Sequence, residues 1–229
     1  MQLKILSWNI WTDGYFDQTL KFLKAFGADI IGLQEVQADN PKRDVIGFLK
    51  KLGYGHVFAP VEKDWGDRVV ADGPAVFCKH KIIKSGTTIL SKEDPRAVAW
   101  ADIVAGGEVL HVFGTHLVHT HQKPSGVQEE QARNLLGMIP NEKSIAIGDF
   151  NAEPESGAIK ILESRLVNAD SNLHPTWSVY PEGCAVCKPQ NVSIKLDYIF
   201  ATADIKTTDF RVEKSRASDH LPISVVVKV

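Results

Sequence analysis

The sequence predicts an α/β fold in which two β-sheets pack against each other and helices cover them from outside. Strand-like segments outnumber helical ones by roughly two to one along the chain. One strand–helix–strand unit requires a parallel connection, whereas a Gly106-Gly107 turn between two other strands is typical of an antiparallel hairpin. This mixture favours two mixed sheets over a single doubly wound sheet, which is mostly parallel.

The first part of the chain predicts a crossover unit followed by a second helix. Lys4 to Ile10 is an expected strand, and Asp29 to Leu33 is an expected fully buried one. Between them, apolar residues recur at helical spacing from Phe16 to Phe26, and Gly27 supplies a helix stop. Another helix is expected from Lys42 to Leu52, between a proline and a glycine.

The rest of the chain predicts mostly strands separated by turn residues. Helices are expected from Gly126 to Met138 and from Gly157 to Glu163. Short runs rich in β-branched and aromatic residues predict strands at Val57 to Ala59, Ala75 to Lys79, Lys81 to Leu90, Ala97 to Val104, Val109 to His116, Ser144 to Ile147, Leu196 to Ala201, Phe210 to Glu213 and Ile223 to Val229. We find no internal repeat, so a solenoid or propeller is excluded.

Composition indicates one globular domain spanning residues 1–229. Of the 229 residues, 44% are hydrophobic and 24% charged, which excludes a disordered, collagen-like or disulfide-stabilised miniprotein. No stretch has the composition of a linker between domains. The 26 basic and 28 acidic residues give a net charge of −2, which argues against tight, non-specific binding of nucleic acid.

The number of cysteines and the N-terminal residues indicate the cellular compartment of the protein. Three cysteines, an odd and sparse number, fit a reducing compartment. Residues 1–9 have neither the long apolar region nor the cleavage site of a signal peptide, and the longest apolar runs are too short to span a membrane. We therefore expect a cytoplasmic protein without a transmembrane segment, and we expect it to be a monomer.

Two long segments, Pro60 to Gly73 and Asp170 to Ser193, show no clear secondary-structure pattern. Long loops of this kind in a compact domain are usually functional. Each contains a tryptophan, Trp65 in the first and Trp177 in the second. These rings could stack on a base or lie at a lipid headgroup, or they could simply anchor the loops, and both interpretations remain open.

Polar side chains of a few types fall at the ends of the expected strands. Each one alone is explained by a helix cap or a solvated turn. As a set they are improbable turn residues, because α/β proteins build their sites at strand ends. The set comprises Asn9, Glu35, His116, Asp149, Asn151, Asp197, Asp219 and His220.

These residue types suit hydrolysis of a phosphate ester. The carboxylates are hard oxygen ligands, and no group of cysteines and histidines has zinc-like spacing, so Mg²⁺ or else Mn²⁺ is favoured. A bound cation neutralises charge on phosphate oxygens, and histidines donate hydrogen bonds to the same oxygens. A further carboxylate can orient or deprotonate the attacking water.

Six short motifs resemble, in their order, the motif set of the endonuclease/exonuclease/phosphatase (deoxyribonuclease I-like) superfamily. They are Ser7-Trp8-Asn9-Ile10, Leu33-Gln34-Glu35-Val36, Gly114-Thr115-His116-Leu117, Gly148-Asp149-Phe150-Asn151-Ala152-Glu153-Pro154, Leu196-Asp197-Tyr198-Ile199-Phe200 and Ser218-Asp219-His220-Leu221-Pro222-Ile223. Any one motif is weak, but six in family order across most of the chain are highly specific. The resemblance implies a four-layer α/β/β/α sandwich, with two packed mixed β-sheets flanked by helices and the site at one edge.

The resemblance also implies a metal site and a phosphate site. Glu35 would be the principal ligand of Mg²⁺, or of Mn²⁺, helped by Asn9 and Asp219. Asn9 would in addition lie on the substrate side.

On the phosphate side, the resemblance implies a catalytic group of five residues. Asp149 would position or activate the water, and Asn151 would hold both that water and the phosphate. His220, oriented by Asp197, would contact the phosphate, and His116 would be the second histidine there.

Two further positions complete the expected substrate-binding residues. Asp72 opens a segment that resembles a family strand whose acidic residue supports the first histidine, here His116, although glutamate is commoner in the family. Arg96 matches a position where the family often places a phosphate-facing arginine; the alternative is a surface charge at a strand start. The expected substrate-binding set is therefore Asn9, Asn151, Arg96 and Asp72.

One branch of the superfamily is disfavoured by two positions. Abasic-site endonucleases often carry an aspartate where this chain has Trp11, and tend to have a tyrosine where it has His116. We therefore expect a divalent-metal-dependent phosphodiesterase that acts by direct water attack, with nucleic acid as the first candidate substrate. The alternatives are a phosphatase or a phospholipid- or sphingomyelin-type phosphodiesterase, and, from another class, a catalytically silent binding domain.

The remaining cysteines and histidines are given a structural interpretation. Cys184 and Cys187 form a lone Cys-x-x-Cys, for which zinc would need His174 or an unrelated ligand, so they are interpreted as reduced loop cysteines. His119 and His121, like His111, are interpreted as solvated or substrate-adjacent.

Overall fold

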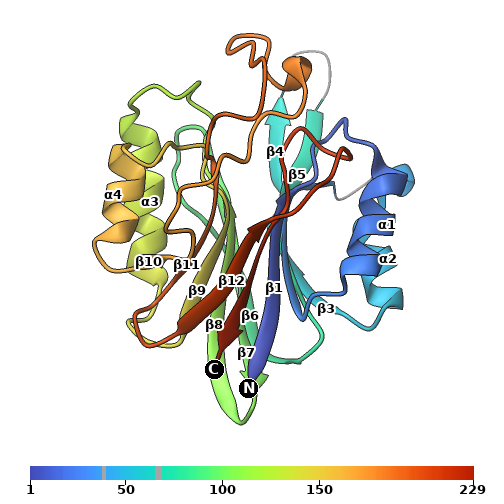
Figure 1. Ribbon diagram of the computed structural model, residues 1–229, viewed down its shortest axis with the longest axis vertical. Helices are drawn as coiled ribbons and strands as arrows, with labels where there is room; N and C mark the ends of the chain where they lie inside the picture. The colour runs from blue at the N-terminus through green and yellow to red at the C-terminus, as the bar shows by residue number, and fades with distance from the viewer. Residues whose placement is uncertain (38–39, 65–68) are drawn as a thin grey trace.

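The computed structural model describes residues 1–37, 40–64 and 69–229. In this part of the chain two mixed β-sheets pack face to face, and a pair of helices covers the outer face of each sheet (Figure 1). The fold class expected from the sequence, a four-layer α/β/β/α sandwich, is thus confirmed.

The first sheet is built around the N-terminal strand. In spatial order it contains β12 (Lys206–Val212), β13 (Ile223–Lys228), β1 (Gln2–Asn9), β2 (Ile30–Gln37), β5 (Val69–Cys78) and β3 (Gly55–Phe58), with β4 (Val61–Asp64) paired to β5. β1 and β2 run parallel because α1 (Phe16–Phe26) connects them, as the predicted crossover requires, and the other pairs are antiparallel.

The second sheet has the spatial order β10 (Val167–Asn168), β11 (Asp197–Ala201), β9 (Ser144–Asp149), β8 (Glu108–His116), β7 (Ala97–Ala105) and β6 (Lys81–Ile89). β8 and β9 are parallel, and the helix α3 (Gly126–Met138) lies between them in the chain. The predicted Gly106-Gly107 turn joins β7 to β8, and both glycines have positive φ, which is a conformation that glycine adopts without strain.

Along β1, apolar side chains point alternately to the core between the sheets and to the helices on the outer face. In β1, Ile5 faces the core between the sheets, where it joins Ile147 of the other sheet, whereas Leu6 and Trp8 face the helices. Leu135 of α3 packs in a separate outer core on the second sheet. Three apolar layers therefore hold the two sheets and the two helix pairs together.

Capping residues explain where several helices begin and end. The side chains of Ser125 and Ser156 accept backbone hydrogen bonds at the starts of α3 and of α4 (Gly157–Glu163). The helix expected over residues 42–52 is instead split into a 3₁₀ turn, Pro41–Arg43, and a shorter α2 (Val45–Lys51). The reason is Asp44, which accepts a hydrogen bond from the Gly47 amide and starts a new helix.

The two segments without a predicted pattern behave differently. Residues 61–64 and 69–73 form β4 and the start of β5, so the expected loop from Pro60 to Gly73 is wrong for these residues; Trp65 lies outside the described residues. The segment from 170 to 193 is largely irregular, as expected, with one 3₁₀ turn at Pro181–Gly183. It leads from β10, which the sequence does not predict, to β11.

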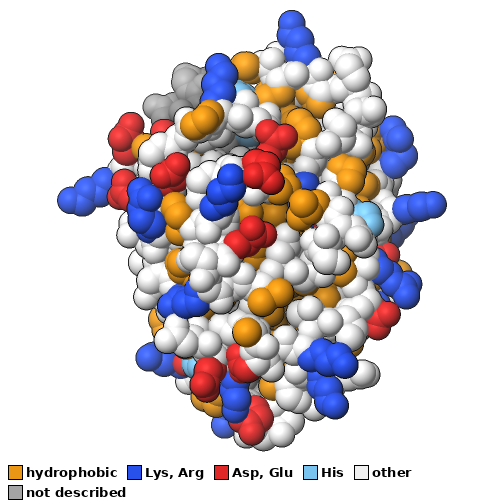
Figure 2. Space-filling view, turned by 60° about the vertical axis from the view of Figure 1, so that its left-hand side comes forward, with side chains coloured by type: hydrophobic (Ala, Val, Ile, Leu, Met, Phe, Trp, Pro, Cys, Tyr) orange, Lys and Arg blue, Asp and Glu red, His pale blue; other side chains and the backbone are white. Residues whose placement is uncertain are grey.

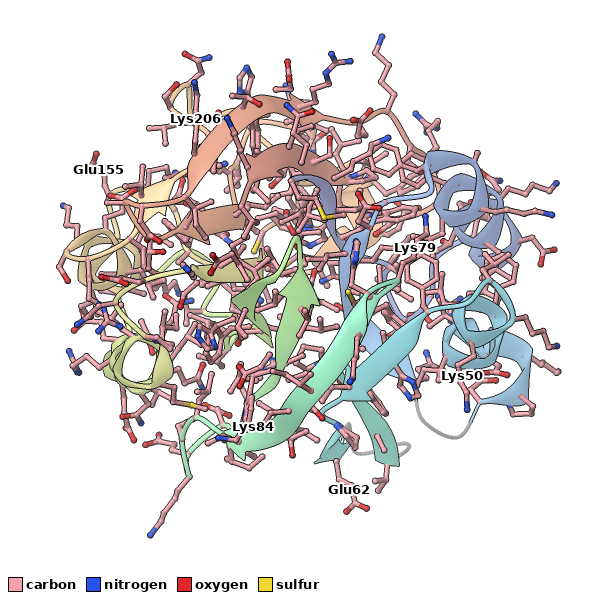
Figure 3. The ribbon with its side chains drawn as sticks, turned by 90° about the horizontal axis from the view of Figure 1, so that it is seen from below. Lys50, Glu62, Lys79, Lys84, Glu155 and Lys206 are labelled. Atoms are coloured by element: carbon pink, nitrogen blue, oxygen red, sulfur yellow. The ribbon has the colours of Figure 1, made fainter. Side chains whose placement is uncertain are left out.

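Lysines lie on strands at the open edges of both sheets. Lys84 belongs to β6 and Lys206 to β12, which end their sheets, and both are labelled in the view from below (Figure 3). Such charges discourage pairing with a strand of another molecule. Among the described residues, no helix is both long and apolar enough to cross a membrane.

Candidate active site

The predicted site residues gather where strands of both sheets end, on the side of the molecule away from the two chain termini (Figure 1). In the second sheet, β9 lies between β8 and β11, and its last residue, Asp149, is in register with His116 on one side and Asp197 on the other. Three neighbouring strands thus place an imidazole and two carboxylates in one row.

The first sheet contributes Asn9 and Glu35 from the adjacent ends of β1 and β2. The pairing of β2 with β5 shifts register between Leu33 and Val36, which marks a bulge. Glu35 lies in this bulge with φ 59°, a backbone conformation that is unfavourable for residues other than glycine. Asn151, just after β9, has φ 49°. Local strain therefore accompanies Glu35, whereas asparagine tolerates the left-handed conformation of Asn151.

Asp149 is the centre of the assembled site. It is 1% exposed, and its Oδ2 accepts a hydrogen bond from Asn9 Nδ2 at 3.0 Å. The same oxygen lies 3.4 Å from His116 Nε2 and 3.6 Å from His220 Nε2. Its other oxygen, Oδ1, accepts from the backbone N–H of Asn151 at 2.8 Å. One carboxylate oxygen therefore faces two imidazole nitrogens, one from the end of β8 and one from the segment just before β13.

His220 is held by a second carboxylate. Its Nδ1 lies 2.9 Å from Asp197 Oδ2, and both side chains are buried. Burial opposes the charged imidazolium, but Asp197, Asp149 and Asp219 together outweigh it and raise the pKa of His220 well above its ordinary value. Burial, and then Asp197, raise the pKa of Asp149, although His220 opposes the shift. His220 is therefore set up to carry a proton on Nε2.

Glu35 and Asp219 form a second acidic group in the same pocket. Asn9 Nδ2 also donates to Glu35 Oε1 at 3.0 Å, so one amide links this group to Asp149. Burial, together with the charge of Glu35, raises the pKa of Asp219 to about 6. Two carboxylates and an amide oxygen donor are hard ligands, so this donor set fits Mg²⁺ or Mn²⁺. The ligand atoms of Asp149, Asp197 and His220 also lie within 4.8 Å of one another.

These residues line one side of a cavity of about 680 Å³. Seven of the expected residues, together with Arg96, contribute to its lining: Asn9, Glu35, His116, Asp149, Asn151, Asp219 and His220. Asp197 acts on this lining through His220. Burial lowers the pKa of Arg96, while Asp72, itself buried, and then Glu35 and Asp149 counteract this shift. The structure therefore places Arg96 in the pocket, whereas the buried Asp72 is outside its lining but near enough for its charge to act on Arg96.

Three further residues take part in the site. From the sequence, Trp177 remains open between a loop anchor and a stacking ring, His119 is interpreted as solvated or substrate-adjacent, and Thr12 is not singled out. Thr12 donates to Glu35 Oε2 from its backbone N–H at 2.6 Å and from its hydroxyl at 2.8 Å. Trp177, only 2% exposed, donates from Nε1 to Asp219 Oδ2 at 3.0 Å, so it anchors the loop and orients a carboxylate. His119 Nδ1 lies 2.7 Å from Asn151 Oδ1. No sequence signal marks these contacts, because each joins a loop to a strand end.

The interpretation of the cysteine pair and of the following histidines requires correction. Cys184 and Cys187 are free cysteines in this structure, but they are not isolated loop residues, since His119 and His121 lie against them. His174, the partner considered from the sequence, instead contacts Asp170 through Nδ1 at 2.7 Å. Burial lowers the pKa of His119, which keeps this imidazole neutral near neutral pH.

Charge on the surface is mixed. Figure 2 shows one face, on which lysine and arginine side chains are scattered among acidic and apolar ones and do not form a single basic stripe. This face therefore offers no continuous track for a nucleic-acid backbone.

Comparison with known proteins identifies the family. The model of the Endonuclease/Exonuclease/phosphatase family matches residues 6–220, so the chain belongs to that family, and it is a phosphoesterase of this superfamily. A search of the curated proteins found no match.

Solved structures agree on the fold. An endonuclease/exonuclease/phosphatase from Beutenbergia cavernae is 22% identical, with a TM-score of 0.80 over 100% of this chain and 72% of the other. ANGEL2, described as a 2′,3′-cyclic phosphatase, is 17% identical, with a TM-score of 0.75 over 99% and 95%. The mannosyl-6-phosphatase Bt3783 of Bacteroides thetaiotaomicron is 18% identical, with a TM-score of 0.69 over 99% and 100%.

Proposed function

We propose that the protein is a Mg²⁺-dependent phosphodiesterase that hydrolyses its substrate by direct attack of water, with nucleic acid as the first candidate substrate. The observation that carries this proposal is the convergence of His116 Nε2 and His220 Nε2 on Asp149 Oδ2 in a pocket that also holds the Glu35–Asp219 pair. This arrangement supplies a base, two hydrogen-bond donors and a cation site around one space.

In this proposal each polar side chain has a defined task. Asp149 orients the water and takes its proton, for which its raised pKa is suitable, because a general base works best when its pKa is near the working pH. His220 donates from Nε2 to a phosphate oxygen, since Asp197 holds its Nδ1. His116 and Arg96 contact the other phosphate oxygens.

The cation site is assigned to Glu35, Asn9 and Asp219. When bound there, Mg²⁺ would supply charge neutralisation at the phosphate and the leaving oxygen. Thr12 fixes Glu35 through two hydrogen bonds, and Trp177 fixes Asp219, so the ligands are held before a cation arrives. Mn²⁺ has similar preferences for oxygen ligands and is expected to substitute.

A phosphomonoesterase or cyclic phosphatase is the second candidate. The lining of the pocket includes Gly183, Cys184, Ala185 and Val186, and its volume is about 680 Å³. A pocket of this size can hold a terminal or small phosphate ester. Two of the similar structures carry phosphatase descriptions, which supports testing these substrates but assigns none to this chain.

The first test replaces the central carboxylate. Asp149→Asn keeps the shape of the side chain but removes the base, and we expect hydrolysis to fall by about 10²- to 10⁴-fold. The assay is a panel of single- and double-stranded DNA, RNA, 5′-tyrosyl DNA, a 2′,3′-cyclic phosphate, a sugar phosphate, inositol phosphates and sphingomyelin, each with Mg²⁺ and with chelator.

Asp209→Asn is the matched control, because Asp209 is exposed on β12. It should keep wild-type turnover. Full activity of Asp149→Asn, or turnover that chelator leaves unchanged, would refute the mechanism; preference for a phosphomonoester over every diester would replace the first candidate by the second.

A further inference from the structure

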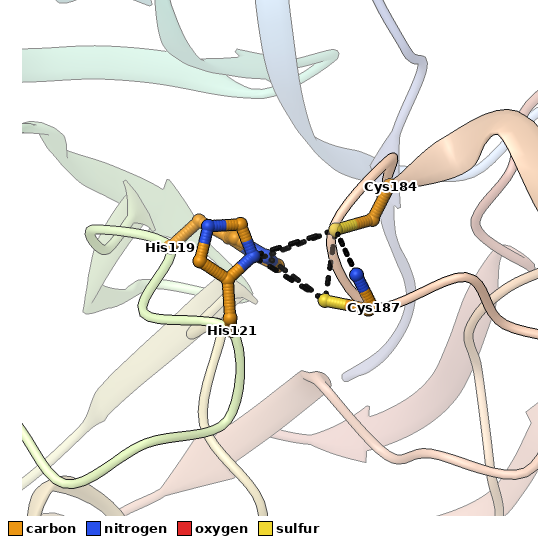
Figure 4. A group of neighbouring side chains, drawn as sticks. All are labelled: His119, His121, Cys184 and Cys187. Atoms are coloured by element: carbon orange, nitrogen blue, oxygen red, sulfur yellow. Dashed lines mark hydrogen bonds between the residues drawn. The ribbon is translucent and has the colours of Figure 1, made fainter.

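Four side chains from two distant parts of the chain converge at the edge of the pocket, whose lining includes three of them (Figure 4). His119 and His121 belong to the loop that follows β8, whereas Cys184 and Cys187 belong to the long connection between β10 and β11. Their Nε2, Nδ1 and two Sγ atoms all lie within 4.8 Å of one another. None of the four is among the residues assigned above to the hydrolytic reaction.

The distances between these atoms describe a small tetrahedron. The two nitrogens are 3.0 Å apart and the two sulfurs 2.8 Å apart. The four nitrogen–sulfur distances are 3.9, 3.4, 3.7 and 3.3 Å. A zinc ion with ordinary bond lengths and tetrahedral angles gives about 3.3 Å between nitrogens, about 3.6 Å between nitrogen and sulfur and about 3.8 Å between sulfurs. Only the sulfur pair must separate appreciably to match.

The local backbone already has the form of a chelating turn. The N–H of Cys187 donates to Cys184 Sγ at 3.0 Å, and the N–H of Lys188 donates to the carbonyl of Cys184 at 3.0 Å. This turn directs both sulfurs of the Cys-x-x-Cys toward the histidines. Simple burial of two thiols would not require two imidazole nitrogens to face them.

We propose that His119, His121, Cys184 and Cys187 form a structural Zn²⁺ site. Two thiolates and two imidazoles are the ligand types that favour Zn²⁺ over Mg²⁺. Four protein ligands fill a tetrahedral site, which leaves no position for a reactive water, so the ion has a structural and not a hydrolytic task. The site is distinct from the oxygen-rich group around Glu35 and does not depend on the proposed reaction.

This zinc site would position one residue of the active site. With Nε2 of His119 bound to zinc, the ring proton resides on Nδ1, which then donates to Asn151 Oδ1 across the observed 2.7 Å. Asn151 Nδ2 in turn donates to the carbonyl of Leu117 at 3.0 Å, so the amide is held at both ends. The side chain of Asn151, whose backbone has a positive φ of 49°, is thereby fixed in one orientation.

The same ion would hold the wall of the pocket. Gly183, Ala185 and Val186 line the cavity and flank the two cysteines in the chain. Tying the cysteines to His119 and His121 joins this wall to the loop after β8. The alternative state is a disulfide between Cys184 and Cys187. It would leave His119 and His121 without a link to the cysteines.

Metal content is the direct test. The protein is expressed with zinc in the medium, purified in Mg²⁺ without chelator under reducing conditions, and its metals are measured by inductively coupled plasma mass spectrometry. We expect one zinc per chain. Replacement by Co²⁺ should give the intense visible absorption of tetrahedral cobalt together with thiolate charge-transfer bands in the near ultraviolet.

Variants test the ligands individually. Cys187→Ser and His121→Asn should each lower zinc affinity at least tenfold and change the Co²⁺ spectrum, and both side chains lie near enough to the surface for the fold to tolerate them. Cys78→Ala and His111→Asn are matched controls at a distant thiol and a distant imidazole and should retain zinc. Circular dichroism checks that every variant is folded.

Three outcomes would overturn the proposal: wild-type protein that binds no zinc, unchanged zinc content in both ligand variants, or a Cys184–Cys187 disulfide in the reduced preparation by mass spectrometry. Asp149→Asn separates this proposal from the hydrolytic one. It should bind zinc normally even though it is inactive, and zinc content is measured without any substrate.

Discussion

At the scale of single residues, the protein also has buried charged side chains outside the pocket. Lys195 and Asp170 form an ion pair at 2.8 Å in which the side chains are 2% and 1% exposed. Asp170 also accepts from the N–H of His174 at 2.7 Å, and Lys195 donates to the carbonyl of Asp197 at 3.2 Å. This pair therefore ties the start of the long connection to the strand end that carries a predicted catalytic residue.

Removal of one charge of this pair should destabilise the protein strongly. Lys195→Met leaves the Asp170 carboxylate buried without its cation, which we expect to lower the free energy of unfolding by about 3–5 kcal/mol. Urea denaturation measures this. The double variant Lys195→Met/Asp170→Asn should recover much of the loss, because no unpaired charge remains.

Lys160→Met serves as the control, since Lys160 pairs with Glu155 at 3.1 Å on the surface. Its effect should stay within about 0.5 kcal/mol. Equal effects of Lys195→Met and Lys160→Met would contradict the assignment of Asp170–Lys195 as a structural ion pair.

Many residues of the candidate site could be predicted from their types and from the order of the motifs along the chain. The contacts between the loops of the site could not. Asp149 and His116 could be selected because they end recognisable strands, and His220 because it lies just before the last strand. The convergence of His119 with Cys187 could not, because 67 positions lie between them and nothing local encodes the path of the connecting loops. Interactions between two irregular segments depend on packing that sequence periodicity does not report.

At the scale of elements, close contact between strands brings His116, Asp149 and Asp197 together in one row. A Cβ added at Gly148 would lie 2.2 Å from the carbonyl oxygen of Thr115 in the neighbouring strand. Gly148 is therefore required for β9 to approach β8 directly before Asp149. The sequence predicts this strand but gives no reason for the glycine, since the reason lies in the partner strand.

Gly148→Ala should be destabilising because the new methyl group meets fixed backbone. We expect a loss of about 1–3 kcal/mol in the free energy of unfolding, measured by thermal or urea denaturation. Gly137→Ala is the comparison, since an added Cβ there meets nothing within 4 Å in the exposed last turn of α3. It should stabilise by about 0.5–1 kcal/mol, and destabilisation of similar size in both variants would argue against the steric explanation.

Charged residues explain why β4 and the start of β5 were missed. Glu62 in β4 and Asp72 in β5 interrupt the apolar pattern of that segment, although Val61 and Val69 are typical strand residues. The pairing of β4 with β5 supplies the stability that local propensity lacks. Long amphipathic helices such as α3, by contrast, were predicted with the correct ends, because their spacing and caps are local signals.

At the scale of the whole molecule, the active-site charges set how stability responds to pH. Burial raises the pKa of Asp219 to about 6 and raises that of Asp149, and nearby carboxylates raise that of His220. In each case the folded state binds a proton more tightly than the unfolded chain. These three groups should therefore make the free energy of unfolding of the metal-free protein fall as pH rises from about 5 to 8, while His119 and His56, whose pKa values burial lowers, act in the opposite direction.

Thermal unfolding in chelator across this range measures the effect. Mg²⁺ should raise the melting temperature most at the alkaline end, where the carboxylates are ionised and bind it best. Asp219→Asn should flatten the pH dependence and remove most of the response to Mg²⁺. A melting temperature that rises steadily with pH in chelator would contradict the directions of these pKa shifts.

The connection between β10 and β11 begins and ends at paired strands, with Asn168 opposite Phe200 in the ladder. Its two ends are thus fixed by the sheet, whatever lies between them. Closing a longer or shorter flexible loop on such ends changes the entropy only slowly with length. With Trp177 and the Asp170–Lys195 pair kept, we expect the rest of this connection to tolerate exchange for other sequences, which would reshape the pocket wall while the row of His116, Asp149 and Asp197 stays in place.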